Sequence, residues 1–210
     1  NTGGGTGDTG TGSGEFSNWV NEVHKITNEQ RARVGASALT LNSKLCDIAY
    51  QKSKDQNDKK YFDHKSPTYG MIWDQLKSNG MDYKTCGENI AIGQTSPKEV
   101  CQGWWDSPGH HANIVNKEFT QLGVGVCKVT NTVVDPEDGD KFTEGYIWTQ
   151  VFFTPASGAR AASITTMAFA MKSPSDIPAN CYLSGKEGCK VQHFDLNEED
   201  IALVDHKTDL

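Results

Sequence analysis

Helical periodicity fills the first half of the chain and strand patterns fill much of the second, and this order limits the fold more than any other feature. Apolar residues recur every three or four positions in four segments that we expect to be helices: 16–34, 42–58, 67–79 and one that begins after Ser96. Alternating β-branched, aromatic and glycine residues predict strands at 86–92, 121–129 and 145–153, with an acidic hairpin loop at 135–140. Helices first and antiparallel strands later indicate an α+β fold with separate helical and sheet layers.

Two local patterns refine the expected helices. Ser96-Pro97-Lys98-Glu99 has the pattern of a capping box with proline at the first helical position, so it predicts where the fourth helix begins. The second helix places Leu45, Ile48, Ala49 and Lys52 on one face. Its lysine- and aspartate-rich end, 52–60, is expected to be a solvent-exposed face.

The length of 210 residues corresponds to one domain with additional segments. Residues 1–15 are rich in glycine and threonine and have almost nothing apolar to bury, so we expect a flexible leader there. The domain should span 16–155, and 156–210 should form a C-terminal extension. Because the chain starts at Asn1 without a signal-peptide pattern, we expect a processed or truncated product.

The acidic balance of the chain argues against two classes of partner. Lys and Arg number 20 against 27 Asp and Glu, which gives a formal net charge of -7. Much of this charge lies in 135–144 and 186–210, so the rest of the chain is close to neutral. Nucleic acids and anionic membranes are bound by basic surfaces, which this composition does not favour. No apolar run is long enough to predict a transmembrane helix.

The chain has six cysteines, and their spacing favours disulfides over a zinc site. It contains no CxxC pair and no zinc-finger spacing of cysteine and histidine. An even number of cysteines in a processed-looking chain favours three disulfides and an oxidising compartment, with free buried thiols as the alternative. Cys181–Cys189 is the simplest pair, because a Ser-Gly turn lies between them. The other four allow three pairings, of which we favour Cys46–Cys127 with Cys86–Cys101.

Glu88 is the most informative polar residue, because it lies between a glycine and a β-branched run in a segment that should be buried. A buried acid needs a partner. His64 and His110 are the histidines best placed to pair with it, so His64, Glu88 and His110 form a candidate metal-binding or catalytic set. The alternative is structural, with the glutamate accepting backbone hydrogen bonds and the histidines bridging loops. Since Trp104 and Trp105 cannot share one helix face, Trp105 is a candidate to line a groove.

Nucleophilic hydrolysis is not favoured by the sequence. The GxSxG pattern of a nucleophile elbow does not occur. Ser66 and Ser107 each precede proline, as residues in turns and at helix starts commonly do. Disulfides explain the cysteines better than a Cys–His catalytic pair.

Several motifs follow one another in a fixed order. They are Asn28-Glu29-Gln30-Arg31, Leu39-Thr40-Leu41-Asn42, Phe62-Asp63-His64-Lys65-Ser66, Gly87-Glu88-Asn89-Ile90, Trp104 to Ile114, Phe119 to Gly125 and Tyr146 to Phe152. Together they resemble the motifs of the CAP superfamily: cysteine-rich secretory proteins, antigen 5 and pathogenesis-related 1 proteins, also called SCP-domain proteins. The resemblance covers roughly residues 16–155. It implies a secreted protein with an α-β-α sandwich, in which a central antiparallel sheet lies between helical layers.

The resemblance also implies a large cleft with two histidines and two glutamates that bind a divalent cation, often zinc. His64 matches the first cleft histidine, and Glu88 matches the glutamate of the Gly-Glu-Asn motif. Ser107 stands where the family has its second glutamate, and Glu118 stands where a second histidine is expected. His110 belongs to a segment similar to the bacterial branch, in which it would turn into the same cleft. The expected cofactor is therefore zinc or another divalent cation, and the further cleft-lining candidates are Ser107, Glu118 and Trp105.

Three functions follow as hypotheses. The first is a secreted binding module that uses the cleft for a divalent metal and for a lipid, a sterol or a protein on a surface. Family members bind sterols and fatty acids, although the loop associated with sterol binding is short here, between Trp105 and Glu118. The second is a metal-dependent, protease-like hydrolase with His64 and Glu88 as base and acid. The third is a structural or antigenic surface protein whose cleft is vestigial. We favour the first.

Overall fold

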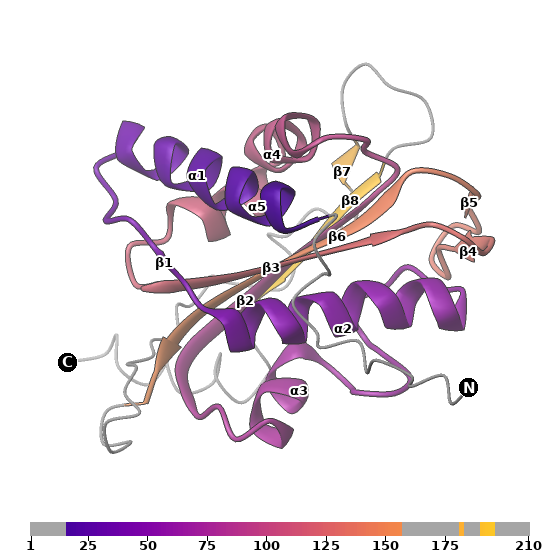
Figure 1. Cartoon of the computed structure of the whole chain (residues 1–210), viewed down its shortest axis with the longest axis horizontal. Coiled ribbons are helices and arrows are strands. Elements are labelled where there is room, and N and C mark those ends of the chain that lie inside the picture. The colour runs from indigo at the N-terminus through magenta and orange to yellow at the C-terminus, as the bar shows by residue number, and fades with distance from the viewer. Residues whose placement is uncertain (1–15, 157–180, 183–189, 196–210) are drawn as a thin grey trace, which may run out of the picture.

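The computed structural model of the chain describes residues 16–156, 181–182 and 190–195, which form three layers (Figure 1). One outer layer holds α1 Ser17–Arg33, α4 Pro97–Asp106 and α5 Pro108–Val115. The other holds α2 Ser43–Lys59 and α3 Ile72–Ser78. A sheet lies between them. The expected α-β-α sandwich of the α+β class is confirmed.

The central sheet has the strand order β1-β3-β6-β2-β8-β7. Its strands are β1 Thr40–Leu41, β2 Tyr83–Ile92, β3 Gln121–Lys128, β6 Tyr146–Pro155, β7 Cys181–Tyr182 and β8 Lys190–Asp195. The neighbours β3, β6, β2, β8 and β7 pair antiparallel, but β1 pairs parallel with β3. The sheet is therefore mixed, whereas a purely antiparallel sheet was predicted. The parallel pair arises in the short connection between α1 and α2, where two residues join the sheet edge in passing.

Glycines in β3 allow α2 to approach the sheet closely. A Cβ atom on Gly123 would lie 2.3 Å from the backbone carbon of Leu45, and one on Gly125 would lie 2.2 Å from that of Ala49. Successive residues of a strand face opposite sides, so the intervening valines pack in the other core. The Gly-Val alternation that predicts this strand thus also determines how near α2 can come.

The core on the α1 side contains two buried tryptophans and a buried arginine. Trp104 of α4 and Trp148 of β6 are completely buried, and Trp148 stacks on Trp19 with ring centroids 5.3 Å apart. The buried guanidinium of Arg31 donates hydrogen bonds to backbone carbonyl oxygens of Ser37, Ile114 and Asn116. These bonds give the buried guanidinium its hydrogen-bond partners. They also join α1 to α5 and to the residues that follow α5.

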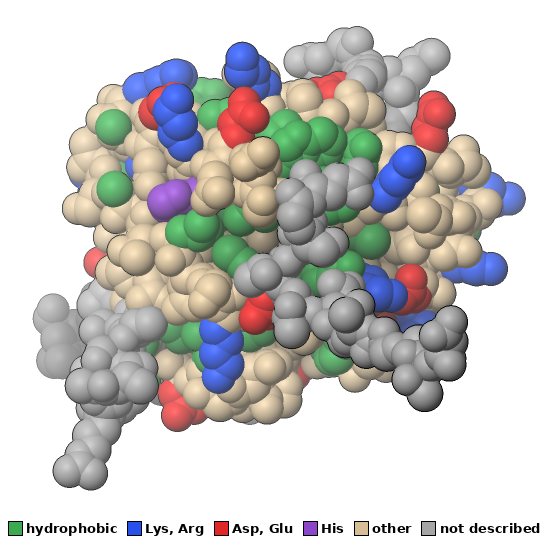
Figure 2. Space-filling view, viewed as in Figure 1, with side chains coloured by type: hydrophobic (Ala, Val, Ile, Leu, Met, Phe, Trp, Pro, Cys, Tyr) green, Lys and Arg blue, Asp and Glu red, His purple; other side chains and the backbone are tan. Residues whose placement is uncertain are grey.

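On the molecular face that carries α1 and α2, apolar side chains gather near the middle and charged side chains lie around them (Figure 2). Phe16, Trp19 and Tyr146 are half-buried aromatic residues that pack on one another and on the α1-side core.

Within the described residues, no helix combines the length and the apolar character needed to cross a membrane.

Local sequence signals account for the starts of α2 and α4, whereas α1 begins without a side-chain cap. Asn42 caps α2, and its Oδ1 accepts hydrogen bonds from the backbone N–H groups of Lys44 and Leu45. Ser96 caps α4 as predicted, and its Oγ accepts from the backbone N–H of Glu99. The expected capping box is not closed on Ser96, because the Glu99 carboxylate instead accepts from the backbone and hydroxyl of the preceding threonine.

The third helix is shorter than predicted, because a tight turn replaces its first residues. Ser66 and Gly70 exchange two backbone hydrogen bonds of 2.8 and 3.0 Å. Gly70 has a φ of 74°, a left-handed conformation that glycine adopts without strain. The helix therefore begins only at Ile72. The short helix α5, which begins at Pro108, was not predicted.

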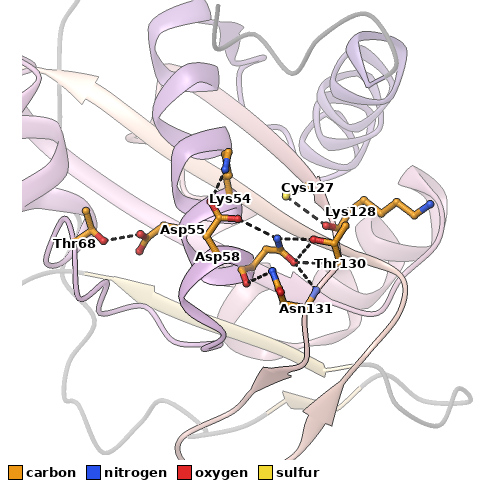
Figure 3. A network of polar contacts seen from close by, with 9 residues as sticks. Lys54, Asp55, Asp58, Thr68, Cys127, Lys128, Thr130 and Asn131 are labelled. Carbon is orange, nitrogen blue, oxygen red and sulfur yellow. Dashed lines mark hydrogen bonds and ion pairs between the residues drawn. The ribbon is translucent and has the colours of Figure 1, made fainter. Parts of the chain in front are cut away.

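The acidic stretch forms a hairpin loop, as predicted, between the short strands β4 Val133–Val134 and β5 Lys141–Phe142. The hairpin is anchored to the end of α2 by Asn57. The Asn57 side-chain oxygen accepts from the backbone N–H groups of Thr130 and Asn131, at 2.8 and 3.3 Å. Figure 3 shows this network, in which Thr130 and Asn131 lie beside α2. The position of the acidic loop thus depends on α2.

The four cysteines in residues 16–156 are free thiols, so the predicted pairs Cys46–Cys127 and Cys86–Cys101 are wrong. Cys86 packs in the α2-side core and Cys101 in the α1-side core, so the sheet separates them. The Cys46 sulfur accepts from the backbone N–H of Val124, which is three residues, or about 10 Å of strand, from Cys127. Burial raises the pKa of the Cys46 thiol and raises that of Cys127 to about 11.

Several predictions concern residues outside the described part of the chain. They include the leader at 1–15, Cys189, the side chain of Cys181 and most of the extension 156–210. The pair Cys181–Cys189 therefore stays a prediction.

Candidate functional site

His64 and Glu88 form a buried pair. His64 Nδ1 lies 2.7 Å from Glu88 Oε1, and the two side chains are only 7% and 1% exposed. Glu88 is in the middle of β2, opposite Val151 of β6, which packs in the cluster that includes the apolar residues of α2. Directly opposed residues in a sheet share a face, so Glu88 points toward the α2 layer. His64 reaches it from the segment that follows α2.

Lys52 of α2 positions the backbone at His64. Its Nζ donates hydrogen bonds to the carbonyl oxygens of Asp63 and His64, both at 2.6 Å. The residue is 1% exposed, and burial lowers the pKa of its amine, while the nearby charge of Glu88 acts in the opposite direction. Lys52 thus joins α2 to the His64 segment by hydrogen bonds, and it also interacts electrostatically with Glu88.

Asp55, one turn further along α2, holds the rest of the same segment. Its carboxylate accepts hydrogen bonds from the hydroxyls of Tyr61, Ser66 and Thr68, at 2.7, 2.7 and 2.6 Å. Burial alone would raise the pKa of Asp55, but these three bonds outweigh burial and keep the pKa below its ordinary value. Figure 3 shows Asp55 and Thr68 pointing toward one another. The segment 61–68 is therefore fixed on α2 from both sides of His64.

His110 lies on α5 and has Ser107 as a partner. His110 is completely buried, and its Nδ1 lies 2.6 Å from Ser107 Oγ. α5 packs on β2 through Asn113, whose side-chain amide donates to Asn89 Oδ1 at 2.9 Å. Because Asn89 and Glu88 are adjacent in a strand, their side chains leave opposite faces of the sheet. α5 therefore approaches β2 from the face that is turned away from α2.

The other two cleft-lining candidates lie at different places. Trp105 packs at the margin of the α1-side core, and its ring centroid is 4.2 Å from that of His111. Glu118 is half-exposed and forms an ion pair of 3.7 Å with Lys84, near the start of β2. The structure thus joins His64 with Glu88 and His110 with Ser107, and it pairs Glu118 with a surface lysine.

The candidate donors do not meet the requirements of a zinc ion. Zinc sites use three or four protein ligands arranged around one point. Among residues 16–156 and the other described positions, no three His, Cys, Asp or Glu side chains form a group that could hold a metal ion. His64 and Glu88 lie on the side of the sheet that faces α2, whereas His110 stands on α5, which approaches β2 from the opposite face. The three side chains do not surround one point, so in this arrangement they do not form a zinc site.

A cavity of about 380 Å³ lies beside the His64 segment. It is lined by Phe62, Asp63, Asp135, Pro136 and Glu137, so the His64 segment and the acidic hairpin loop form its walls. Phe62 and Asp135 are completely buried, Asp63 is half-buried and Glu137 is exposed. Three of the five lining residues are acids and none is basic, and Asp63 and Glu137 are the acids whose side chains are accessible to a ligand in this space.

Sequence reasoning missed Lys52, Asp55 and the lining role of Asp135. The expectation of a solvent-exposed face at 52–60 is wrong for its first part, where Lys52, Asp55, Gln56 and Asn57 are buried. The available signal was periodicity, because Lys52 follows Ile48 and Ala49 on the apolar face of α2. The many lysines and aspartates at 52–60 suggested exposure instead, although the periodicity continues to Lys52. The approach of the hairpin loop to Phe62 depends on tertiary packing and had no local signal.

The chain matches the CAP model, described as the cysteine-rich secretory protein family, over residues 24–152. It is 41% identical over 147 residues to the uncharacterized protein YkwD of Bacillus subtilis (strain 168), a match that covers 70% of this chain and 51% of that protein. It is 32% identical over 105 residues to the uncharacterized membrane protein YlbC of the same strain, covering 50% of this chain and 30% of that protein. The chain thus spans about half, or less, of the length of these relatives.

Solved structures agree with this match. An extracellular protein containing a SCP domain from Bacillus anthracis has a TM-score of 0.54 and 32% sequence identity, covering 65% of this chain and 40% of that one. An outer surface protein of Borrelia burgdorferi, with a TM-score of 0.50 and 13% identity over 65% of this chain and 92% of that one, shares the fold alone. The family match extends over more than half of the sequence and includes α2, β2 and the His64–Glu88 pair. On these grounds the chain belongs to the CAP family of cysteine-rich secretory proteins.

Proposed function

We propose that this chain is an extracellular binding module that holds a cationic side chain of a protein partner in the cavity beside His64. The observation that carries the proposal is the lining of the cavity, in which the accessible acids Asp63 and Glu137 lie with the exposed ring of Pro136. A lysine or arginine side chain has an apolar stem and a charged end, and it matches both kinds of wall. The extracellular description of the B. anthracis relative supports the location.

Hydrogen bonds hold both walls of the cavity in place before a ligand binds. Lys52 and Asp55 hold one wall through five hydrogen bonds to the segment 61–68. Asn57 holds the chain that leads into the other wall. A preorganised site avoids part of the entropic cost of ordering a loop on binding.

The same lining argues against the lipid, sterol and hydrolase alternatives. Pockets for sterols and acyl chains are predominantly apolar, whereas three of the five residues here are acids. A metal-dependent hydrolase needs side chains that hold the metal beside its base. Among the described residues no three His, Cys, Asp or Glu side chains form such a group, and His64 and Glu88 are buried against one another. A partner that presents lysine or arginine accounts for the cavity more simply.

Fluorescence polarisation with a fluorescein-labelled tetralysine peptide tests the proposal, with the ε-acetylated peptide as the control ligand. We expect the charged peptide to bind and the acetylated one not to bind. Glu137→Gln and Asp63→Asn should each weaken binding about threefold or more, which corresponds to roughly 0.7 kcal/mol for an accessible charge pair. Glu144→Gln makes the same chemical change on the same hairpin outside the cavity, and it should leave binding within about twofold. Equal binding of both peptides, or equal effects of Glu137→Gln and Glu144→Gln, would refute the proposal.

A further inference from the structure

The strand β2 has a neighbour on each side, and the two neighbours come from different parts of the chain. On one side β2 pairs with β6 over nearly its whole length, from Tyr83 to Ile92. On the other side it pairs with β8, in a register that runs from Gly87 opposite Asp195 to Ile92 opposite Lys190. Without β8, β2 would be the edge of the four strands that residues 16–156 contribute to the central sheet.

β8 lies along the part of β2 that carries the candidate site. Phe194 occupies the register position opposite Glu88, and His193 the position opposite Asn89. β8 also packs beside α5, the helix that carries His110. The strand therefore runs past the two elements on which Glu88 and His110 stand.

The layers on both faces of the sheet are built from residues that precede β8. Three apolar clusters drawn from residues 16–153 connect α1, α2, α3 and α4 to strands β2, β3 and β6. These clusters give the domain a core that holds β2 in place from both faces. An open edge strand exposes a row of backbone N–H and C=O groups that can pair with another extended segment.

We propose that the edge of β2 at 87–92 is a strand-acceptor site, that residues 190–195 of the same chain fill it as a cover, and that this cover can leave while the domain stays folded. The released edge would accept an extended peptide by backbone pairing, directly beside the His64–Glu88 pair. The cover thus controls access to this flank of the site. The inference concerns the edge of β2 and does not depend on the cationic ligand proposed for the cavity.

Amide hydrogen exchange measured by NMR on the full chain tests this inference without any ligand. Gln192→Pro should break the pairing opposite Ile90, because the proline ring does not fit within a paired strand. Gln192→Ala is the matched control. In β2, alternate residues direct their N–H groups toward β8 and toward β6. We expect the amides directed toward β8 to exchange at least about tenfold faster in the proline variant, while those directed toward β6 keep their wild-type rates.

Two additions complete the experiment. A synthetic peptide with the sequence of residues 188–196, added to the proline variant, should restore slow exchange at the same amides. Exchange in the wild-type chain should be independent of protein concentration, because the cover comes from the same chain. Unchanged exchange throughout β2 would contradict the inference. So would equal acceleration at both sets of amides, which would make β8 part of the cooperative core, or concentration-dependent protection, which would place a second copy on the edge.

Discussion

At the residue scale, the site depends on charged groups that are buried and held by hydrogen bonds. Lys52 donates to two backbone carbonyl oxygens, and Asp55 accepts from three hydroxyls. Glu88 is 1% exposed and pairs with His64. An unpaired buried charge is costly, so the removal of any one partner should affect the others.

Lys52→Met keeps the apolar stem but removes both bonds to the His64 segment. We expect it to lower the free energy of unfolding by about 3 kcal/mol, since two buried carbonyl oxygens lose a charged donor and Glu88 loses a nearby cation. Lys54→Met is the matched control on the same helix. Lys54 forms an exposed pair with Asp58, so its loss should change stability by less than about 0.5 kcal/mol. Urea denaturation of both variants gives the change in the free energy of unfolding. Similar losses for the two would show that the bonds of Lys52 to the His64 segment do not stabilise the fold.

Asp55 should make stability depend on pH at the acidic end. Its pKa in the folded protein is below the ordinary value of about 3.9, so its contribution is fully present above that pH and is lost as the pH falls through the folded-state pKa. Asp55→Asn keeps the shape and removes the charge. The stability difference between wild type and variant should therefore be largest near pH 6 and should shrink below about pH 4. A difference that stays constant from pH 6 to pH 3 in urea denaturation would argue against a charged Asp55.

At the scale of elements, periodicity predicted the helices and strands that are long and amphipathic. α1, α2, β3 and β6 lie within a few residues of their predicted ranges. The failures occur where a turn or a tertiary contact decides the structure. Gly70 closes a turn that shortens α3, and β1 is a two-residue strand that exists only because β3 lies beside it. A composition rich in lysine and aspartate concealed the buried part of α2.

Gly125 tests the close approach of α2 to the sheet. Gly125→Ala would place a Cβ atom 2.2 Å from the backbone of Ala49, so α2 must move. We expect a loss of about 3 kcal/mol in the free energy of unfolding, the upper part of the range for overpacked cores. Lys128→Ala at the exposed end of the same strand should cost less than about 0.5 kcal/mol. If chemical denaturation gave the same small loss for both, the packing of α2 on β3 would be looser than described.

The free thiols make a prediction about redox. In a variant with Cys181→Ser and Cys189→Ser, a reducing agent should leave Tm unchanged, because the remaining four cysteines form no disulfides. Ellman's reagent should react slowly with the buried thiols of the native variant and quickly once it is unfolded. A fall in Tm on reduction, or fewer than four thiols in the unfolded variant, would restore the disulfide hypothesis for this part of the chain.

At the scale of the whole molecule, the sandwich brings together segments that are far apart in the sequence. α2 supports the His64 segment with Lys52 and Asp55, and it supports the acidic hairpin with Asn57. The sequence was sufficient to predict His64 as a partner of Glu88, because an acid buried between strand residues needs a hydrogen-bond or ionic partner. It could not identify the cavity, because Phe62 and Asp135 meet only after α2 and the hairpin have packed. The acidic loop, first noted as a contribution to net charge, is one wall of the proposed binding site.

The most direct test of a binding site at this cavity is an NMR titration of the 15N-labelled chain with unlabelled tetralysine peptide. We predict that the amide signals of Phe62, Asp63 and Glu137 shift together in a saturable way. The shifts should weaken as salt is added, because accessible charges are screened. Saturable shifts centred instead on Trp105 and Glu118, or no saturable shift at low salt, would contradict a binding site between the His64 segment and the acidic hairpin.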